Sequence, residues 1–239
     1  MQYQLIRSIR RKTIALQVKN AQVIVRAPEF VKVEYIDKLV KLKSAWLNKK
    51  LAQQVSPASN SLSPCLNNGF SFENPLYIDG VPHKVIICFG KQKVFHDEIE
   101  QSLHVFISAR YRHYELSSAI IIEKVKRSIE LWFKSTLLDY INHKLPLLSE
   151  KTLLHAKSFK VRKYKARWGS CNNRGELSFN YLLKMVPPWV VDYVIVHELC
   201  HLKHMNHSTN FWQLVEHQCP DFRLAKSWLK ENQASLIWC

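Results

Sequence analysis

The chain has 239 residues, of which 47% are hydrophobic and 23% are charged, and it contains only 5 Gly and 9 Pro. This composition is typical of a folded globular protein and excludes the disordered, collagen-like and low-complexity classes. The 35 Lys and Arg residues outnumber the 19 acidic residues and give a net charge of +16. Nucleic acid and nucleoside triphosphates therefore stay open as partners, beside the simpler interpretation of a solvated basic surface.

The start of the chain and the cysteine usage predict a cytoplasmic protein without a membrane partner. No run of about 18 uncharged apolar residues is present. The first residues, MQYQLIRSIRRK, are basic but are not followed by the apolar core of a secretory signal. The six Cys form no CxxC pair, so we expect free thiols in a reducing compartment.

The first part of the chain predicts strands and one helix. Alternating apolar residues indicate strands at 12–19 and 22–27, with Asn20 in the turn between them. Spacings of three and four residues then predict a helix over 31–55, with an apolar stripe of Tyr35, Leu39, Leu42, Trp46 and Leu47. Residues 56–68, rich in Ser, Pro and Asn, indicate a loop.

Short strands follow at 69–108, where the pieces LYIDG, HKVIICFG and SLHVFIS are separated by turns at Asp79-Gly80 and Gly90. The pattern then changes to helix. A long apolar stripe over 115–145 ends at Pro146, and its members are Leu116, Ala119, Ile120, Val125, Ile129, Trp132, Phe133, Leu137 and Ile141.

The last part alternates strand and helix signals. Residues 157–168 look extended and very basic, and residues 177–183 are a strand candidate. Pro187-Pro188 precede a strong helix over 189–205, and two further helices are expected at 209–218 and 222–233, with Ser208 capping the first of them. We therefore predict an α+β chain, in which a β-rich N-terminal region with one helix (residues 1–110) is followed by a C-terminal domain (residues 111–239).

The predicted helix over 189–205 carries the motif HELCH. His197 and His201 are one helical turn apart and point the same way, so two imidazoles can bind one zinc ion. Glu198 is placed to reach a water on that ion without ligating it. The apolar flank of the helix, from Val190 to Leu202, indicates burial on most sides, where His, Glu and His without a partner would be costly.

A third ligand is needed for a zinc site with an open position. His207 lies six residues beyond His201, and Asn206 can adopt the left-handed conformation that ends a helix and returns His207 to the metal. His204 could ligate instead or stabilise an oxyanion, although we expect it to face solvent. With three His ligands, a water of lowered pKa and Glu198 as general base, the motif predicts metal-dependent hydrolysis of a carbonyl or phosphoryl centre.

Basic residues alternate just before this region. In an extended chain Lys163, Lys165 and Arg167 project from one face, with Lys160 and Arg162 on the other. If this strand borders the metal, the cations favour a polyanionic substrate such as a triphosphate, or a DNA or acidic peptide partner. The simpler interpretation is a charged edge strand that resists aggregation.

The sequence resembles the YgjP-like metal-dependent hydrolases, relatives of the SprT-like and other HExxH zinc proteases. The matching pieces are 11–14 (RKTI), 25–28 (VRAP), 46–47 (WL), 167–171 (RWGSC), 177–180 (LSFN), 187–193 (PPWVVDY), 196–202 (VHELCHL), 206–208 (NHS), 211–212 (FW) and 220–221 (PD). Two pieces depart from the family pattern. The usual Leu-Gly-x-x-Tyr strand is replaced by LYIDG at 76–80, and the Ser before RWGSC is Ala166.

The resemblance implies a small zincin-like domain with a supporting helix, a short sheet and a metal helix. It also implies zinc on His197, His201 and His207, with Glu198 as the base. Substrate would contact the segment that contains Arg167, Trp168 and Ser170, together with Asn180. The β-rich N-terminal part would be a family-specific addition.

Three functions follow from these patterns. The preferred one is a zinc-dependent hydrolase of the metallopeptidase type, which acts on a peptide or protein. The first alternative is a pyrophosphohydrolase of nucleoside triphosphates, since the resemblance also implies activity on UTP. The second is a basic nucleic-acid-associated zinc protein, which only the net charge supports. Imidazole ligands also suit other divalent ions than zinc.

Overall fold

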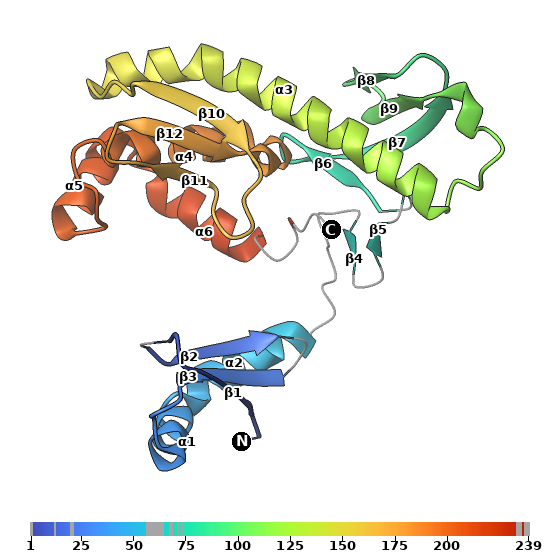
Figure 1. Ribbon diagram of the computed structural model, residues 1–239. Coiled ribbons are helices and arrows are strands. Elements are labelled where there is room, and N and C mark those ends of the chain that lie inside the picture. The colour runs from blue at the N-terminus through green and yellow to red at the C-terminus, as the bar shows by residue number, and fades with distance from the viewer. Residues whose placement is uncertain are drawn as a thin grey trace. The chain divides into compact units, whose positions relative to one another are not determined.

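The computed structural model describes residues 2–11, 13–19, 22–55, 65–66, 69–70, 72, 74–232 and 236. The chain divides into two compact units, Met1–Ser59 and Asn60–Cys239 (Figure 1). Over these residues helices are mixed with four small sheets. The four cysteines with described side chains are free thiols. None of the described helices combines the length and the apolarity that crossing a bilayer requires.

The first unit contains a three-stranded sheet, β1 (Gln4–Ser8), β2 (Ala15–Lys19) and β3 (Gln22–Pro28). β3 is the central strand, parallel to β1 and antiparallel to β2. The predicted strands at 12–19 and 22–27 are confirmed, with Lys12 and Asn20 outside the described residues. β1 was not predicted, because its burial along QLIRS does not alternate regularly.

The helix predicted over 31–55 is two helices, α1 (Val33–Leu42) and α2 (Ser44–Val55). Lys43 lies between them, and its backbone N–H donates to Leu39 O while its carbonyl accepts from Leu47 N. The backbone hydrogen bonds therefore continue across a short turn, and one helical phase does not hold over the whole segment.

The predicted apolar stripe on these helices is wrong at three positions. Tyr35 is 59% exposed, Leu42 is 77% exposed and Trp46 is 45% exposed. The core of the first unit is formed instead by Ile36 and Val40 of α1 and Leu47 of α2, which pack with the apolar side chains of β3. The competing row at Ile36 and Val40 is also spaced at four residues, so spacing alone did not decide which row is buried.

The second unit begins with the pair β4 (Cys65–Leu66) and β5 (Gly69–Phe70) and a four-stranded sheet. The sheet has the spatial order β6-β7-β9-β8, and its strands are β6 (Leu76–Ile78), β7 (Val81–Phe89), β8 (Lys93–Asp97) and β9 (Ser102–Ile107). The strands predicted in 69–108 are confirmed, and β8 is an addition. The sheet is followed by the short helix η1 (Ala109–Tyr111).

Helix α3 (Ala119–Thr152) is the longest described element, and it runs along the four-stranded sheet and along a later sheet that contains Ser158–Arg162 (Figure 1). The expectation that Pro146 ends it is wrong, because the helix continues to Thr152. A proline removes only one backbone hydrogen bond, and here the flanking turns are held by buried residues on both sides. The buried row runs through Ile121, Val125 and Ile129, whereas Leu116 and Ile120 of the predicted stripe are exposed.

The compact units divide the chain differently from the predicted regions of 1–110 and 111–239. The strands of 76–107 bury Leu76, Ile78, Leu103 and Val105 in the same core as the apolar row of α3. They belong to the second unit for that reason. The change from strand to helix signals near residue 110 therefore marks a change of element type inside one core.

The rest of the second unit holds the metal motif. A three-stranded sheet has the order β10-β12-β11, with β10 (Ser158–Arg162), β11 (Gly169–Cys171) and β12 (Glu176–Asn180). It is followed by η2 (Tyr181–Met185), α4 (Pro188–Cys200), α5 (Thr209–Gln218) and α6 (Phe222–Asn232). The extended basic segment predicted at 157–168 is a strand only to Arg162, and the strand predicted at 177–183 ends at Asn180.

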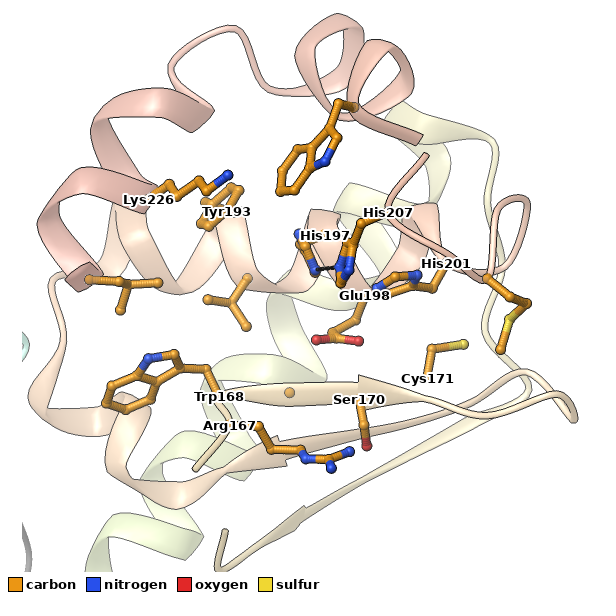
Figure 2. A pocket seen from close by; sticks show the side chains of 15 residues that line it. Arg167, Trp168, Ser170, Cys171, Tyr193, His197, Glu198, His201, His207 and Lys226 are labelled. Carbon is orange, nitrogen blue, oxygen red and sulfur yellow. Dashed lines mark hydrogen bonds between the residues drawn. The ribbon is translucent and has the colours of Figure 1, made fainter. Parts of the chain in front are cut away.

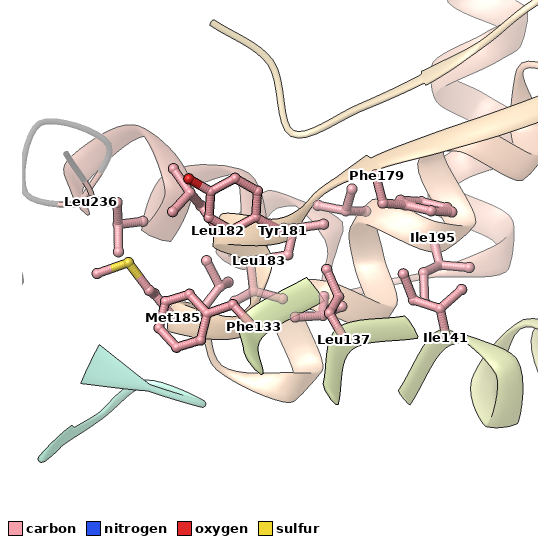
Figure 3. Packing of buried hydrophobic residues seen from close by; sticks show 14 of the residues in the cluster. Phe133, Leu137, Ile141, Phe179, Tyr181, Leu182, Leu183, Met185, Ile195 and Leu236 are labelled. Carbon is pink, nitrogen blue, oxygen red and sulfur yellow. The ribbon is translucent and has the colours of Figure 1, made fainter. Parts of the chain in front are cut away.

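A continuous apolar core joins α3 to this sheet and to α4. Phe133, Leu137 and Ile141 of α3 belong to one cluster with Phe179 of β12 and Ile195 of α4 (Figure 3). All five side chains are fully buried or nearly so. Since α4 is apolar on most of its surface, this burial fixes its position, and only its polar positions are left to face a cavity.

The tight turn between β6 and β7 packs against the residues that lead into α4. Asp79 and Gly80 both have positive φ, 52° and 84°, as the predicted two-residue hairpin requires. The backbone N–H groups of Asp79 and Gly80 donate to Lys184 O (2.8 Å) and Met185 O (3.1 Å) of η2. A Cβ on Gly80 would lie 2.6 Å from Cγ of Pro187, which precedes α4.

We expect Gly80→Ala to lower the free energy of unfolding by about 2 kcal/mol or more, because it combines an unfavourable positive φ with a clash against a rigid proline ring. Gly90→Ala is the matched control, since its φ is not positive and its nearest neighbour, Phe106 Cδ1, is 3.8 Å away. Urea unfolding of both variants measures the difference. Equal stability of the two variants would contradict this role of the turn.

Candidate metal centre

Helix α4 begins with Pro188 at its first turn and is anchored to α3 by a polar contact. Asp192 accepts a hydrogen bond from Tyr140 Oη (2.6 Å) and pairs with Lys144 Nζ (3.2 Å). Burial raises the pKa of the Tyr140 hydroxyl, and the contact with Asp192 raises it further, so this group stays a donor. This contact holds the first part of α4, and the apolar core holds the rest of the helix in place.

Three imidazoles meet at the end of α4. His197 and His201, one turn apart, have ring centroids 5.0 Å apart, and the ring of His207 lies 5.1 Å and 4.8 Å from them (Figure 2). One ring nitrogen from each residue lies within 4.8 Å of the others. Among the described residues this is the group of His, Cys, Asp or Glu side chains that could hold a metal ion.

The chain reaches His207 by a different route from the predicted one. Asn206 is not in the left-handed region, so the expectation of a left-handed end at this residue is wrong. The helix ends at Cys200 instead, through turns in which Leu202 N donates to Leu199 O and His204 N to Cys200 O. Ser208 then caps α5 as predicted, because its Oγ accepts from Phe211 N at 3.4 Å.

His204 contributes its backbone and not its ring. The carbonyl of His204 lies 3.0 Å from Nδ1 of His201, and its imidazole is not part of the cluster. With Nδ1 donating to that carbonyl, Nε2 of His201 keeps its lone pair for a ligand. Phe211 stacks on His201 and Trp212 on His207, which fixes the planes of these two rings.

The donor set fits a divalent metal ion. His207 Nε2 and His197 Nε2 lie 3.1 Å apart, and two such nitrogens need a shared proton or a cation between them. Burial, and next the neighbouring His201, lowers the pKa of His197 to about 3, so this imidazole is neutral at physiological pH. Burial also lowers the pKa of His201. Neutral imidazoles with free Nε2 lone pairs are the form that zinc and similar ions bind.

Glu198 lies beside the three rings and is almost fully buried, with 5% of its surface exposed. Its Oε2 has no hydrogen-bond partner among the described residues. Burial raises the pKa of this carboxyl to about 8, against a smaller lowering by Arg167. A buried carboxylate without a partner costs free energy, which is the arrangement expected of a group that exchanges a proton with a reactant.

Gly169 of β11 allows α4 to approach the sheet this closely. A Cβ at this position would lie 2.5 Å from Oε1 and 2.7 Å from Cγ of Glu198. Any side chain at residue 169 therefore displaces the Glu198 side chain from Cγ outward, and not only its carboxylate oxygens. The glycine of the RWGSC segment is required by this contact.

A cavity of about 530 Å³ opens onto the three rings and Glu198. Figure 2 shows β11 with Trp168, Ser170 and Cys171 on one side and Lys226 and Tyr193 on the other. Of the predicted substrate-contact residues, the structure brings Arg167, Trp168 and Ser170 to this cavity.

Three other predicted substrate-contact residues do not line the cavity. Lys163 pairs with Glu130 of α3 at 3.1 Å, and Lys165 lies beyond the end of β10. The alternation that predicted one cationic face fails because the strand stops at Arg162. Asn180 supports the wall from behind, since its Nδ2 donates to Tyr164 O and Arg167 O and its Oδ1 accepts from Leu182 N.

The sequence patterns gave no site role to several residues that line the cavity. Among them are Tyr193, Trp212 and Lys226. Tyr193 lies one turn before His197 on α4, which is a signal that helical spacing could have given. Lys226 of α6 has no motif of its own, and it is held over the ring of Trp212 with its Nζ 4.0 Å from the ring centroid.

Comparison with known proteins identifies the family. The sequence profile described as "YgjP-like, metallopeptidase domain" matches residues 12–232, and the chain belongs to the YgjP-like family. No curated protein matches the chain. A solved structure of the metallopeptidase zymogen abylysin from Pyrococcus abyssi has 18% sequence identity and a TM-score of 0.34, covering 39% of this chain and 95% of that one.

We expect His207→Ala to weaken zinc binding by more than about 100-fold, because it removes a nitrogen of the cluster. His204→Ala is the matched control and keeps the affinity, since only its backbone carbonyl contacts His201. Competition with a chromogenic chelator measures both affinities. If His204→Ala loses zinc and His207→Ala retains it, the third ligand is His204 and the assignment to His207 is wrong.

We expect Gly169→Ala to keep bound metal and lose most of its hydrolytic activity, about 100-fold or more, because the new Cβ displaces the Glu198 carboxylate and leaves the imidazoles in place. Metal content and turnover are measured on the same preparation. Gly90→Ala is the matched control, because Gly90 does not line the cavity and the nearest atom to its added Cβ would be 3.8 Å away. Full activity in Gly169→Ala would contradict the proposed position of Glu198.

Proposed function

We propose that the chain is a zinc-dependent peptidase, in which His197, His201 and His207 hold the metal and Glu198 is the general base. The observation that carries this proposal is the placement of an unpartnered, buried carboxylate oxygen beside three converging imidazoles at the floor of a cavity. The family supports it, because its matched domain is described as a metallopeptidase.

Each part of the site has a role in peptide hydrolysis. Zinc, when bound, acts as a Lewis acid toward a carbonyl and makes water more acidic. Glu198 accepts a proton from the attacking water through Oε2, and the same carboxyl then gives this proton to the nitrogen of the leaving amine.

The form of the cavity supports an extended peptide as the substrate. β11 is an outer strand of its sheet, and among the described strands it pairs only with β12. The residues of β11 line the cavity. An extended chain can add to such an edge through backbone hydrogen bonds, with alternate side chains directed into the cavity. Trp168 and Trp212 offer apolar contact surface there.

The nucleotide alternative has lost part of its support. The resemblance, the net charge and the cations at 160–167 favoured it, and two of those cations, Lys163 and Lys165, do not line the cavity. Arg167 and Lys226 are the cations that do. The cavity also lacks further Asp or Glu side chains of the kind that hold magnesium on a triphosphate.

We expect Glu198→Gln to keep the metal and lower the hydrolysis of denatured casein by about 10²–10⁴-fold, since an amide cannot accept the proton. Glu216→Gln is the matched control, because Glu216 is an exposed residue of α5 that pairs with Arg223. Peptide release and pyrophosphate release from a nucleotide panel are measured in parallel. Release of pyrophosphate that depends on Glu198, with intact casein, would contradict the peptidase proposal in favour of the nucleotide reaction.

A further inference from the structure

Two further cavities lie along the first half of α3, between this helix, η1 and β8. The two cavities have volumes of about 260 and 370 Å³ and share Gln92, Ser128 and Leu131, so they adjoin each other. We call the two together the α3 groove, and the residues that matter in it are Arg110, Tyr111, Lys124, Arg127, Leu131 and Trp132. It shares no lining residue with the cavity at the imidazoles.

The α3 groove carries positive charge that the protein does not neutralise. Arg110, Lys124 and Arg127 line one cavity and Lys93 lines the other, and within the described part of the chain none of these four has a carboxylate within 4 Å. No Asp or Glu lines either cavity. Uncompensated cations around one groove repel one another, and an anionic ligand relieves that repulsion.

Tyr111 holds two of the cations, Arg110 and Lys124, in position. Nη2 of Arg110 donates to the hydroxyl of Tyr111 at 2.8 Å, and its guanidinium lies 4.8 Å from the centroid of the same ring. Nζ of Lys124 lies 5.9 Å from that centroid on the side of α3. Because Tyr111 orients both groups, less side-chain entropy is lost when a ligand binds.

An apolar platform continues from the cations. Leu131 is 53% exposed, and Trp132 is half-buried in the adjoining cavity. The Trp132 ring is fixed by an edge contact with His96 at 5.4 Å and by Phe133 at 5.7 Å. A planar base can pack against this surface while its phosphates lie at Arg110, Lys124 and Arg127.

We propose that the α3 groove binds single-stranded nucleic acid. Cations for phosphates, followed by an aromatic side chain for a base, are the combination by which proteins hold single strands without reading their sequence. Two adjoining cavities suit a strand better than one nucleotide, and the net charge of +16 favours a polyanion as the partner. This inference does not depend on the hydrolytic reaction.

The test measures binding of a labelled oligothymidylate to the full-length protein by fluorescence anisotropy over a range of salt concentrations. We expect the triple variant Arg110→Gln, Lys124→Gln and Arg127→Gln to bind at least about tenfold more weakly than the wild type. The slope of log K against log salt falls by about 2, because three phosphate contacts are lost. Photocrosslinking of a bromodeoxyuridine strand to the unmodified protein provides a second measurement, with crosslinks expected at Trp132 or Tyr111.

The control variant Lys157→Gln and Arg174→Gln removes exposed cations that act on Glu176, outside the groove. If the control variant and the groove variant lose equal affinity per charge removed, the strand is bound by net charge alone and the proposal is overturned. Three other outcomes overturn it as well: no binding, crosslinks only outside the groove, or full displacement of the strand by an equal concentration of mononucleotide or of polyglutamate.

Discussion

The close contact between α4 and β11 is the constraint on which the site depends. Gly169 has no side chain, and the carboxylate of Glu198 occupies the space where a Cβ would be. The same contact directs His197 and His201, one turn of helix apart, into the cavity beside the strand. A methyl group at residue 169 would occupy the space of this carboxylate and displace it from the wall of the cavity.

The remainder of the second unit keeps that contact in place. Tyr140 and Lys144 of α3 hold Asp192 near the start of α4, and Tyr181 and Lys163 both bind Glu130 of α3. Exposed pairs of this kind add about 0–1 kcal/mol each, so the apolar core supplies most of the stability and the polar contacts set the register. Lys163, predicted to contact substrate, is part of this support.

Local patterns in the sequence predicted which side chains gather at the end of α4 better than they predicted the walls of the cavity. The spacing of His197, Glu198 and His201 is a property of one helix, and the nearby His207 lies in the cluster as expected. The family resemblance is confirmed over residues 12–232. Lys226 and the contact between Gly169 and Glu198 join residues far apart in the chain, and no local spacing encodes such contacts.

The errors in the fold have the same origin. The buried row on α1 was misplaced because two rows have similar spacing and only packing against β3 selects Ile36 and Val40. Pro146 was given too much weight, since tertiary contacts on both sides of it keep α3 helical. The strands of 76–107 were placed with the N-terminal strands because a change of element type was taken for a change of core.

X-ray absorption at the zinc edge of the metal-loaded protein measures directly which atoms hold the ion. We expect three nitrogen scatterers at about 2.0–2.1 Å with outer-shell imidazole signals, one additional light scatterer and no sulfur. A sulfur scatterer at about 2.3 Å would contradict this ligand set, because Cys171 lines the cavity and a thiolate ligand would close the open position.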